Sequence, residues 1–119
     1  MELKFVAAAR PEKVDATVQR RQKLVCRIDQ QIGFVRQMID GKQPRAAWVW
    51  MDGDGKYFLP IHYGRHQIEL QKGKFAIECS DLDHVEAALC TIRVMVLRGD
   101  FDAQLAKVSA DIRGKFGKE

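Results

Sequence analysis

The stretch PEKVDATVQRRQKLVCRIDQQIGFVRQMID, residues 11–40, decides the fold. Its apolar residues recur at alternating spacings of four and three, the pattern of a helix that buries one narrow seam. The seam consists of Val14, Val18, Val25, Ile28, Ile32, Val35 and Ile39. Arg21 occupies the position where the pattern would place an eighth apolar residue. Its charge is either buried in the seam or exposed at the surface. We predict one long helix over 11–40, beginning at Pro11 and closed by Gly41.

A helix of this length would overhang a compact domain of 119 residues, because it would extend for about 45 Å. Either the helix breaks at Gly33, or one end projects, or a second copy of the chain covers the overhang. A homodimer through the helix at 11–40 is therefore one of the alternatives that the sequence raises.

Composition is that of an ordinary globular protein. The chain is 46% hydrophobic and 30% charged, and no apolar run is long enough to span a bilayer. Cys26, Cys79 and Cys90 are odd in number and lie in apolar patterns, which predicts reduced cysteines in the core. We expect a single cytoplasmic domain over residues 1–119, without membrane contact.

Positive charge is concentrated in the N-terminal third. Residues 1–45 hold ten Lys and Arg against five Asp and Glu, whereas residues 46–79 hold four of each. Such a concentration can attract nucleic acid or an acidic protein surface. The alternative is a solvated helix face with surplus lysine and arginine.

A change to period-two alternation after Pro44 predicts antiparallel strands, separated by the short turn sequences DGDG, YG and KG. The expected strands lie at 46–51, 56–62, 65–71 and 74–79. Pro60 cannot donate to a ladder, so the second strand is expected to be bulged or at an edge there. We predict one four-stranded antiparallel sheet over 46–79.

Two helices are predicted at 80–114. Ser80 and Asp83 have the spacing of a capping box, and Gly99 ends the first helix of the pair. A frayed basic tail is expected at 115–119. The fold class is therefore α+β, with elements in the order α-β-β-β-β-α-α.

Alternation along the strands sorts their side chains onto two faces. The apolar face, which the helices at 80–114 would cover, consists of Tyr57, Leu59, Ile61, His66, Ile68, Leu70, Phe75 and Ile77. The opposite face carries Phe58, with Trp48 and Trp50 placed beside it across the DGDG turn. We expect the helix at 11–40 to cover these three aromatics and make them core. If that helix lies elsewhere, they would form an open platform for base stacking.

The sequence contains no catalytic motif. DGDG at 52–55 lacks the later oxygen ligands of a calcium loop. His62, His66 and Cys79 are a conceivable zinc set, but the two histidines are separated by the turn at Gly64. No nucleophile elbow, phosphate-binding loop or dinucleotide motif is present. We expect a protein that is not an enzyme, without metal or cofactor.

Three stretches carry a resemblance: QRRQKLVCRIDQQI, GKYFLPIHYGRHQIELQKGKFAIE and LDHVEAALCTIRVMVLRGDFDAQL. Together they resemble a family of short proteins of proteobacteria and their phages, which has no established activity. The resemblance covers about half of the chain and implies a bacterial or prophage origin. Residues 48–102 are also similar in architecture to the arm-type DNA-binding domains of phage integrases, although they lack the dense Arg and Lys run of those domains.

We predict a small non-catalytic bacterial or phage protein that binds nucleic acid through its basic N-terminal helix. The expected phosphate contacts are Arg20, Arg21, Lys23 and Arg27, extended by Lys56, Arg65 and Lys74. The alternative is a phage-encoded inhibitor or adaptor that binds and occludes a host protein. Its interface would contain Trp48, Trp50 and Phe58.

Overall fold

The computed structural model describes residues 2–8 and 15–117, with side chains up to residue 110. Its elements are α1 (Ala16–Ile39), β1 (Trp50–Met51), β2 (Tyr57–Pro60), β3 (His62–Tyr63), β4 (His66–Gln67), β5 (Ala76–Cys79), α2 (Leu82–Arg98) and α3 (Asp102–Gly117). The predicted α+β class is confirmed. Within the described ranges, no helix combines the length and apolar character needed to cross a membrane.

Helix α1 corresponds to the long helix that the apolar seam predicts. Its N-cap is Asp15, whose carboxylate accepts a hydrogen bond from the Thr17 backbone N–H at 2.9 Å. The helix ends at Ile39, and Gly41 follows with a positive φ of 89°. The predicted C-terminal end is confirmed, whereas the predicted start at Pro11 lies outside the described residues.

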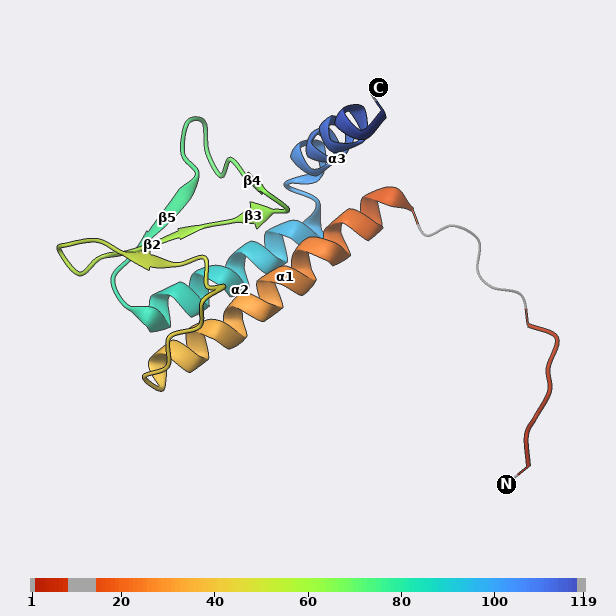
Figure 1. Ribbon diagram of the computed structural model, residues 1–119, viewed down its shortest axis with the longest axis horizontal. Coiled ribbons are helices and arrows are strands. Elements are labelled where there is room, and N and C mark those ends of the chain that lie inside the picture. The colour runs from red at the N-terminus through yellow and green to blue at the C-terminus, as the bar shows by residue number, and fades with distance from the viewer. Residues whose placement is uncertain (1, 9–14, 118–119) are drawn as a thin grey trace.

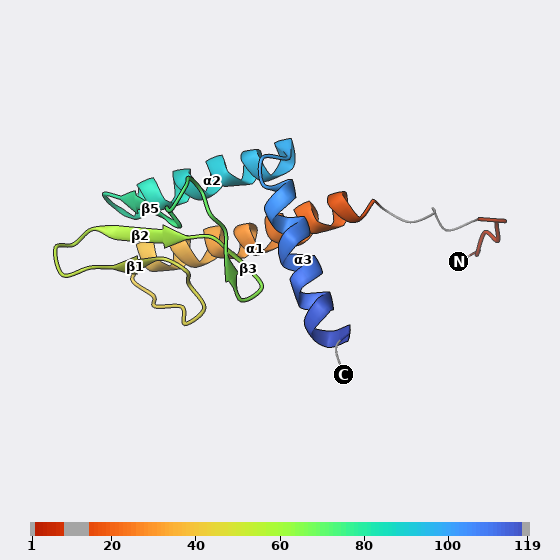
Figure 2. The same cartoon turned by 90° about the horizontal axis from the view of Figure 1, so that it is seen from above.

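Helices α1 and α2 lie side by side and run antiparallel, and the strands lie against this pair (Figure 1). Helix α3 follows the C-terminal end of α2 and crosses α1 at a steep angle near the N-terminal end of α1 (Figure 2). The largest fully buried side chains are Leu24, Ile28, Val35, Leu59, Ile61, Ile68, Cys79, Val85, Leu89, Val96 and Leu105. One connected apolar cluster therefore holds the helices and strands together.

The strands do not form the single four-stranded sheet that was predicted. Strands β1, β2 and β5 form one antiparallel sheet, and β3 and β4 form a separate hairpin. The division follows Pro60, which pairs with Ala76 at the end of β2 and has no N–H to continue a ladder. Beyond it, the Ile68 N–H still donates to the Ile61 carbonyl at 2.8 Å. The two sheets are therefore consecutive parts of one bent ribbon.

The strand predicted at 46–51 is shortened to β1 by a buried side chain of α1. Gln31, which is 5% exposed, donates to the Ala46 carbonyl at 3.0 Å and accepts from the Trp48 N–H at 2.8 Å. These hydrogen bonds satisfy backbone groups that a strand ladder would otherwise use. A glutamine on the inner face of α1 therefore determines where β1 begins.

The helices cover the sheet face that the sequence marked as apolar. Leu59, Ile61 and Ile68 on this face are fully buried. His66 and Phe75, which were assigned to the same set, are exposed because they lie near the ends of β4 and β5. The prediction is therefore correct for the centre of the face and wrong at its margins.

The opposite sheet face is open. We expected α1 to cover it, but α1 packs beside α2 against the first face (Figure 1). Trp50 on the open face is consequently 52% exposed. Phe58 is half-buried, and Trp48 is half-buried because it packs against the core cluster. The expectation that all three aromatics belong to the core is therefore wrong for Trp50.

The predicted helical pair is present as α2 and α3, with differences at its ends. The N-cap of α2 is Asp81, in place of the capping box predicted for Ser80 and Asp83. Helix α3 continues to Gly117, so most of the tail predicted at 115–119 is helical. Residues beyond this helix lie outside the described part of the chain.

We predict that Gln31→Ala lowers the free energy of unfolding by about 2–4 kcal/mol, because it leaves the Ala46 carbonyl and the Trp48 N–H without partners. Urea unfolding followed by circular dichroism measures this change. Gln37→Ala, at an exposed position of α1, is the matched control and should cost less than about 0.5 kcal/mol. Equal effects of the two substitutions would contradict the role assigned to Gln31.

Candidate functional site

A groove of about 800 Å³ runs between α1, the β3–β4 hairpin and α3. Arg20, Lys23 and Arg27 lie in its α1 wall, at spacings that place side chains on one face of a helix. The same wall contains Ala16, Gln19, Cys26 and Gln30. The facing wall consists of Tyr63, Gly64 and Ser109. We call this hollow the basic groove.

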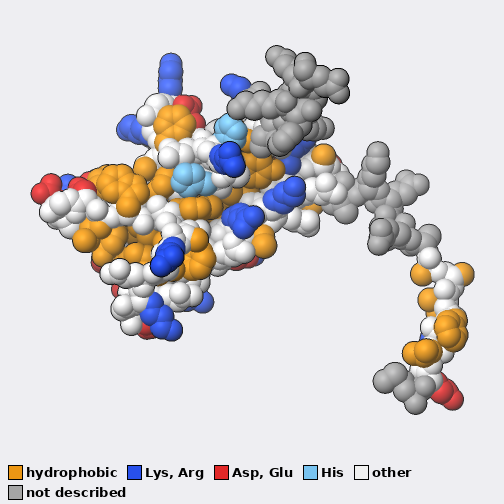
Figure 3. Space-filling model, viewed as in Figure 1, with side chains coloured by type: hydrophobic (Ala, Val, Ile, Leu, Met, Phe, Trp, Pro, Cys, Tyr) orange, Lys and Arg blue, Asp and Glu red, His pale blue; other side chains and the backbone are white. Residues whose placement is uncertain are grey.

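The three cations of the basic groove have no carboxylate partner within the described part of the chain. Arg27 donates a hydrogen bond to the side-chain oxygen of Gln30 at 3.2 Å. The ion pairs that the structure does contain involve other lysines and arginines. Figure 3 shows Lys and Arg side chains gathered over α1 on this side of the molecule. The groove therefore offers a ligand positive charge that is not engaged in ion pairs.

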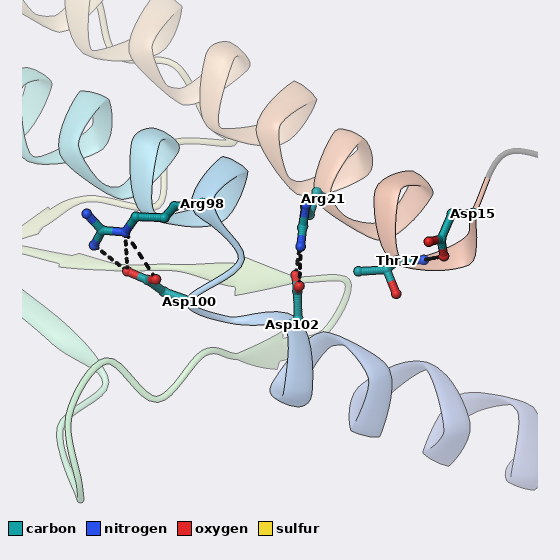
Figure 4. A network of polar contacts seen from close by, with 6 residues as sticks. All are labelled: Asp15, Thr17, Arg21, Arg98, Asp100 and Asp102. Atoms are coloured by element: carbon teal, nitrogen blue, oxygen red, sulfur yellow. Dashed lines mark hydrogen bonds and ion pairs between the residues drawn. The ribbon is translucent and has the colours of Figure 1, made fainter.

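Arg21 has a different role from its neighbours on α1. Its guanidinium makes a bidentate ion pair with Asp102, the first residue of α3, and Nε lies 2.8 Å from Oδ1 (Figure 4). The hydrogen bond from Arg21 holds the pKa of Asp102 below its ordinary value, and the same bond raises the pKa of Arg21. Arg21 is thus a half-buried charge that ties α3 to α1. It is not free for the phosphate contact that we predicted from the sequence.

Gly99 leaves room for this ion pair. It is the C-cap of α2 and has a φ of 95°, a backbone conformation that strains other residues. A Cβ atom here would lie 2.8 Å from Nη2 of Arg21 and 2.9 Å from Oδ2 of Asp102. The prediction that Gly99 ends this helix is confirmed. Because Gly99 has no side chain, α3 can approach α1 closely.

Further contacts hold α3 against the strands. The Gln104 side chain accepts from the Glu69 N–H at 2.8 Å and donates to the Glu69 carbonyl at 2.6 Å. The Tyr63 hydroxyl lies 3.4 Å from Oγ of Ser109. The second of these contacts joins two residues of the wall that faces α1. Sequence reasoning missed this wall, because no local pattern connects residues 63 and 109.

The remaining predicted phosphate contacts do not line the basic groove. Lys56 forms an ion pair with Glu78 at 3.3 Å on the sheet. Lys74 lies in the turn before β5. Arg65 follows Gly64, a groove residue, in the β3–β4 turn. Of these three cations, Arg65 alone is adjacent in sequence to the groove.

The aromatic residues that the sequence singled out make two ring contacts. Trp50 stacks on Phe58 with ring centroids 4.7 Å apart and planes 25° apart, as their pairing across β1 and β2 requires. The rings of Trp48 and His62 have centroids 5.5 Å apart. Burial lowers the pKa of His62, so its ring is neutral at neutral pH.

The described residues include potential metal ligands and free thiols, and the thiols differ in their exposure. These residues contain no group of three His, Cys, Asp or Glu side chains suited to a metal ion. Cys26 and Cys90 are exposed, so the prediction of core cysteines is correct for Cys79 alone. Burial raises the pKa of the Cys79 thiol, which disfavours the reactive thiolate.

No family model, curated protein or solved structure matches this chain. The resemblances drawn from the sequence therefore stay predictions.

We predict that Asp102→Asn lowers the free energy of unfolding at pH 7, and that its difference from the wild type shrinks in acid. The pKa of Asp102 is lower in the folded than in the unfolded state. The ionised carboxylate therefore stabilises the fold fully at pH values above about 4, the ordinary pKa of an aspartate in the unfolded chain. This stabilisation is lost as the pH falls through the folded pKa. Urea unfolding between about pH 7 and pH 2 follows the difference.

The control for this experiment is Asp54→Asn, at an exposed position in the β1–β2 turn. It keeps the change in charge but removes no contact between helices. A difference between Asp102→Asn and the wild type that does not vary with pH would show that the ion pair does not stabilise the fold.

Proposed function

We propose that this protein binds nucleic acid, with backbone phosphates in the basic groove and Arg20, Lys23 and Arg27 as their contacts. One observation carries the proposal: these cations share one groove and lack carboxylate partners in the described ranges. Contacts from lysine and arginine to phosphates supply much of the affinity of such complexes.

The form of the groove supports a chain-like ligand. Arg20 and Arg27 are two turns apart, which is about 10 Å along α1, and Lys23 lies between them. A row of cations of this length fits successive phosphates better than a single anion. Arg65 in the β3–β4 turn would add a fourth cation at the edge of the groove.

The side chains of the groove favour binding over catalysis. Its described lining includes the Cys26 thiol and the hydroxyls of Tyr63 and Ser109. No histidine or carboxylate is among these lining residues to serve as a general base. We therefore infer a non-catalytic role, in a bacterial or phage protein as the sequence resemblance implies.

Binding to a protein is the second candidate, and exposed apolar side chains on β1 favour it. Trp50 is 52% and Met51 is 58% exposed, and exposed aromatics of this kind dominate the energetics of many interfaces. The protein would then act as an inhibitor or adaptor that occludes a host protein. In that case the basic groove would be a solvated surface.

We predict that the double charge reversal Arg20→Glu and Lys23→Glu weakens nucleic-acid binding and flattens its salt dependence. Loss of two phosphate contacts should reduce the slope of log K against log salt by about 2. Fluorescence anisotropy with a labelled oligonucleotide, at about 50 and 200 mM salt, measures both quantities.

The matched control is Lys42→Glu with Lys72→Glu, which makes the same change in net charge at two exposed positions outside the groove. It should leave the salt slope nearly unchanged. If the two double variants lose equal affinity, binding follows net charge and the groove is not the site.

A further inference from the structure

The open side of the sheet carries an aromatic strip, which consists of Trp48, Trp50, Phe58 and His62. Trp50 and Phe58 stack with centroids 4.7 Å apart, and 52% of the Trp50 surface remains exposed. An indole that is stacked on one side can accept another planar group on its free side. The strip therefore has the capacity to bind a flat, unsaturated ring.

Two residues that contact Trp48 are direct neighbours, in the sequence, of residues of the basic groove. Gln30 lines the groove, and the next residue, Gln31, accepts a hydrogen bond from the Trp48 N–H at 2.8 Å. Tyr63 also lines the groove, and the preceding His62 contacts the Trp48 ring at a centroid distance of 5.5 Å. Figure 3 shows hydrophobic, histidine and basic side chains close together over the strands and α1. Charged and aromatic side chains therefore share this side of the molecule.

We propose that the ligand is single-stranded nucleic acid, with its backbone in the basic groove and an unpaired base stacked on Trp50. This inference rests on the proposed function and narrows it. Bases in a duplex are stacked on their neighbours, so they offer no free face to an exposed indole. Single strands expose their base faces, and proteins bind them with a positive groove beside aromatic side chains.

The positive charge of the basic groove favours a polyanion over a protein as the partner of the aromatic strip. A protein surface that covered Trp50 and Phe58 would also have to accommodate the row of cations in the basic groove. A nucleic-acid strand can occupy both surfaces, since its nucleotides carry both phosphates and flat bases. The observed juxtaposition therefore favours the single strand.

The test compares four labelled ligands of about 12 nucleotides by fluorescence anisotropy. They are single-stranded DNA, single-stranded RNA, the corresponding DNA duplex, and a DNA strand in which central nucleotides are abasic. We expect either intact single strand to bind more tightly than the duplex. The abasic strand keeps its phosphates and should bind about 5- to 150-fold more weakly than the intact DNA strand, if DNA is the preferred ligand. An abasic RNA strand replaces it if RNA is preferred.

Substitution of Trp50 tests whether this residue makes the stacking contact with the base. Trp50→Ala should weaken binding of the intact strand by a similar factor and leave binding of the abasic strand unchanged. The salt slope should not change, because no phosphate contact is removed. Met51→Ala, at the neighbouring exposed position of β1, is the matched control. Trp50→Phe keeps a stacking ring and should recover part of the affinity, even if Trp50→Ala folds poorly.

Two outcomes would overturn the inference, and they are distinguishable. In the first outcome, the single strands, the duplex and the abasic strand bind equally and with the same salt dependence, and Trp50→Ala does not change their affinity. This result would refute the stacking contact but leave the proposed function intact. Absence of binding to every oligonucleotide at about 50 mM salt would refute both proposals. The aromatic strip would then be assigned to a protein partner.

Discussion

The ion pair between Arg21 and Asp102 is the interaction on which the candidate site depends. It joins two residues that are 81 positions apart and holds the beginning of α3 against α1 (Figure 4). Gly99 leaves space for the two side chains at the turn between α2 and α3. Because α3 supplies part of the facing wall, the groove exists only while this helix is held in place. A contact that stabilises the fold thus also shapes the candidate binding surface.

The basic residues of α1 divide according to what they face. Arg21 and Arg36 point toward neighbouring helices, where Asp102 and Glu86 neutralise them. The cations of the basic groove form no ion pair with a described carboxylate, so they are available to a ligand. The same helix therefore buries one side in the core, fixes its neighbours with paired charges and presents a third side to solvent. This division explains how one helix can both stabilise the fold and contribute to the proposed binding surface.

Sequence patterns predicted what depends on neighbouring residues. Apolar periodicity predicted the long helix, and the concentration of Lys and Arg predicted that this helix is basic. The shortened β1 could not be predicted, because it depends on hydrogen bonds from Gln31 to a segment 15 residues away. The exposure of Trp50 could not be predicted either: alternation shows which residues share a face, but not which face a distant helix covers. The partner of Arg21 was equally hidden, since no local pattern connects α1 with α3.

Protection of Cys26 from alkylation tests the central claim most directly. Cys26 lines the basic groove, Cys90 is exposed on α2, and Cys79 is buried, so the wild-type chain contains its own controls. A neutral alkylating reagent is applied with and without saturating oligonucleotide, and mass spectrometry follows each thiol. We predict that the oligonucleotide slows alkylation of Cys26 and leaves that of Cys90 unchanged. An unchanged rate at Cys26, or equal slowing at both thiols, would contradict binding in the groove.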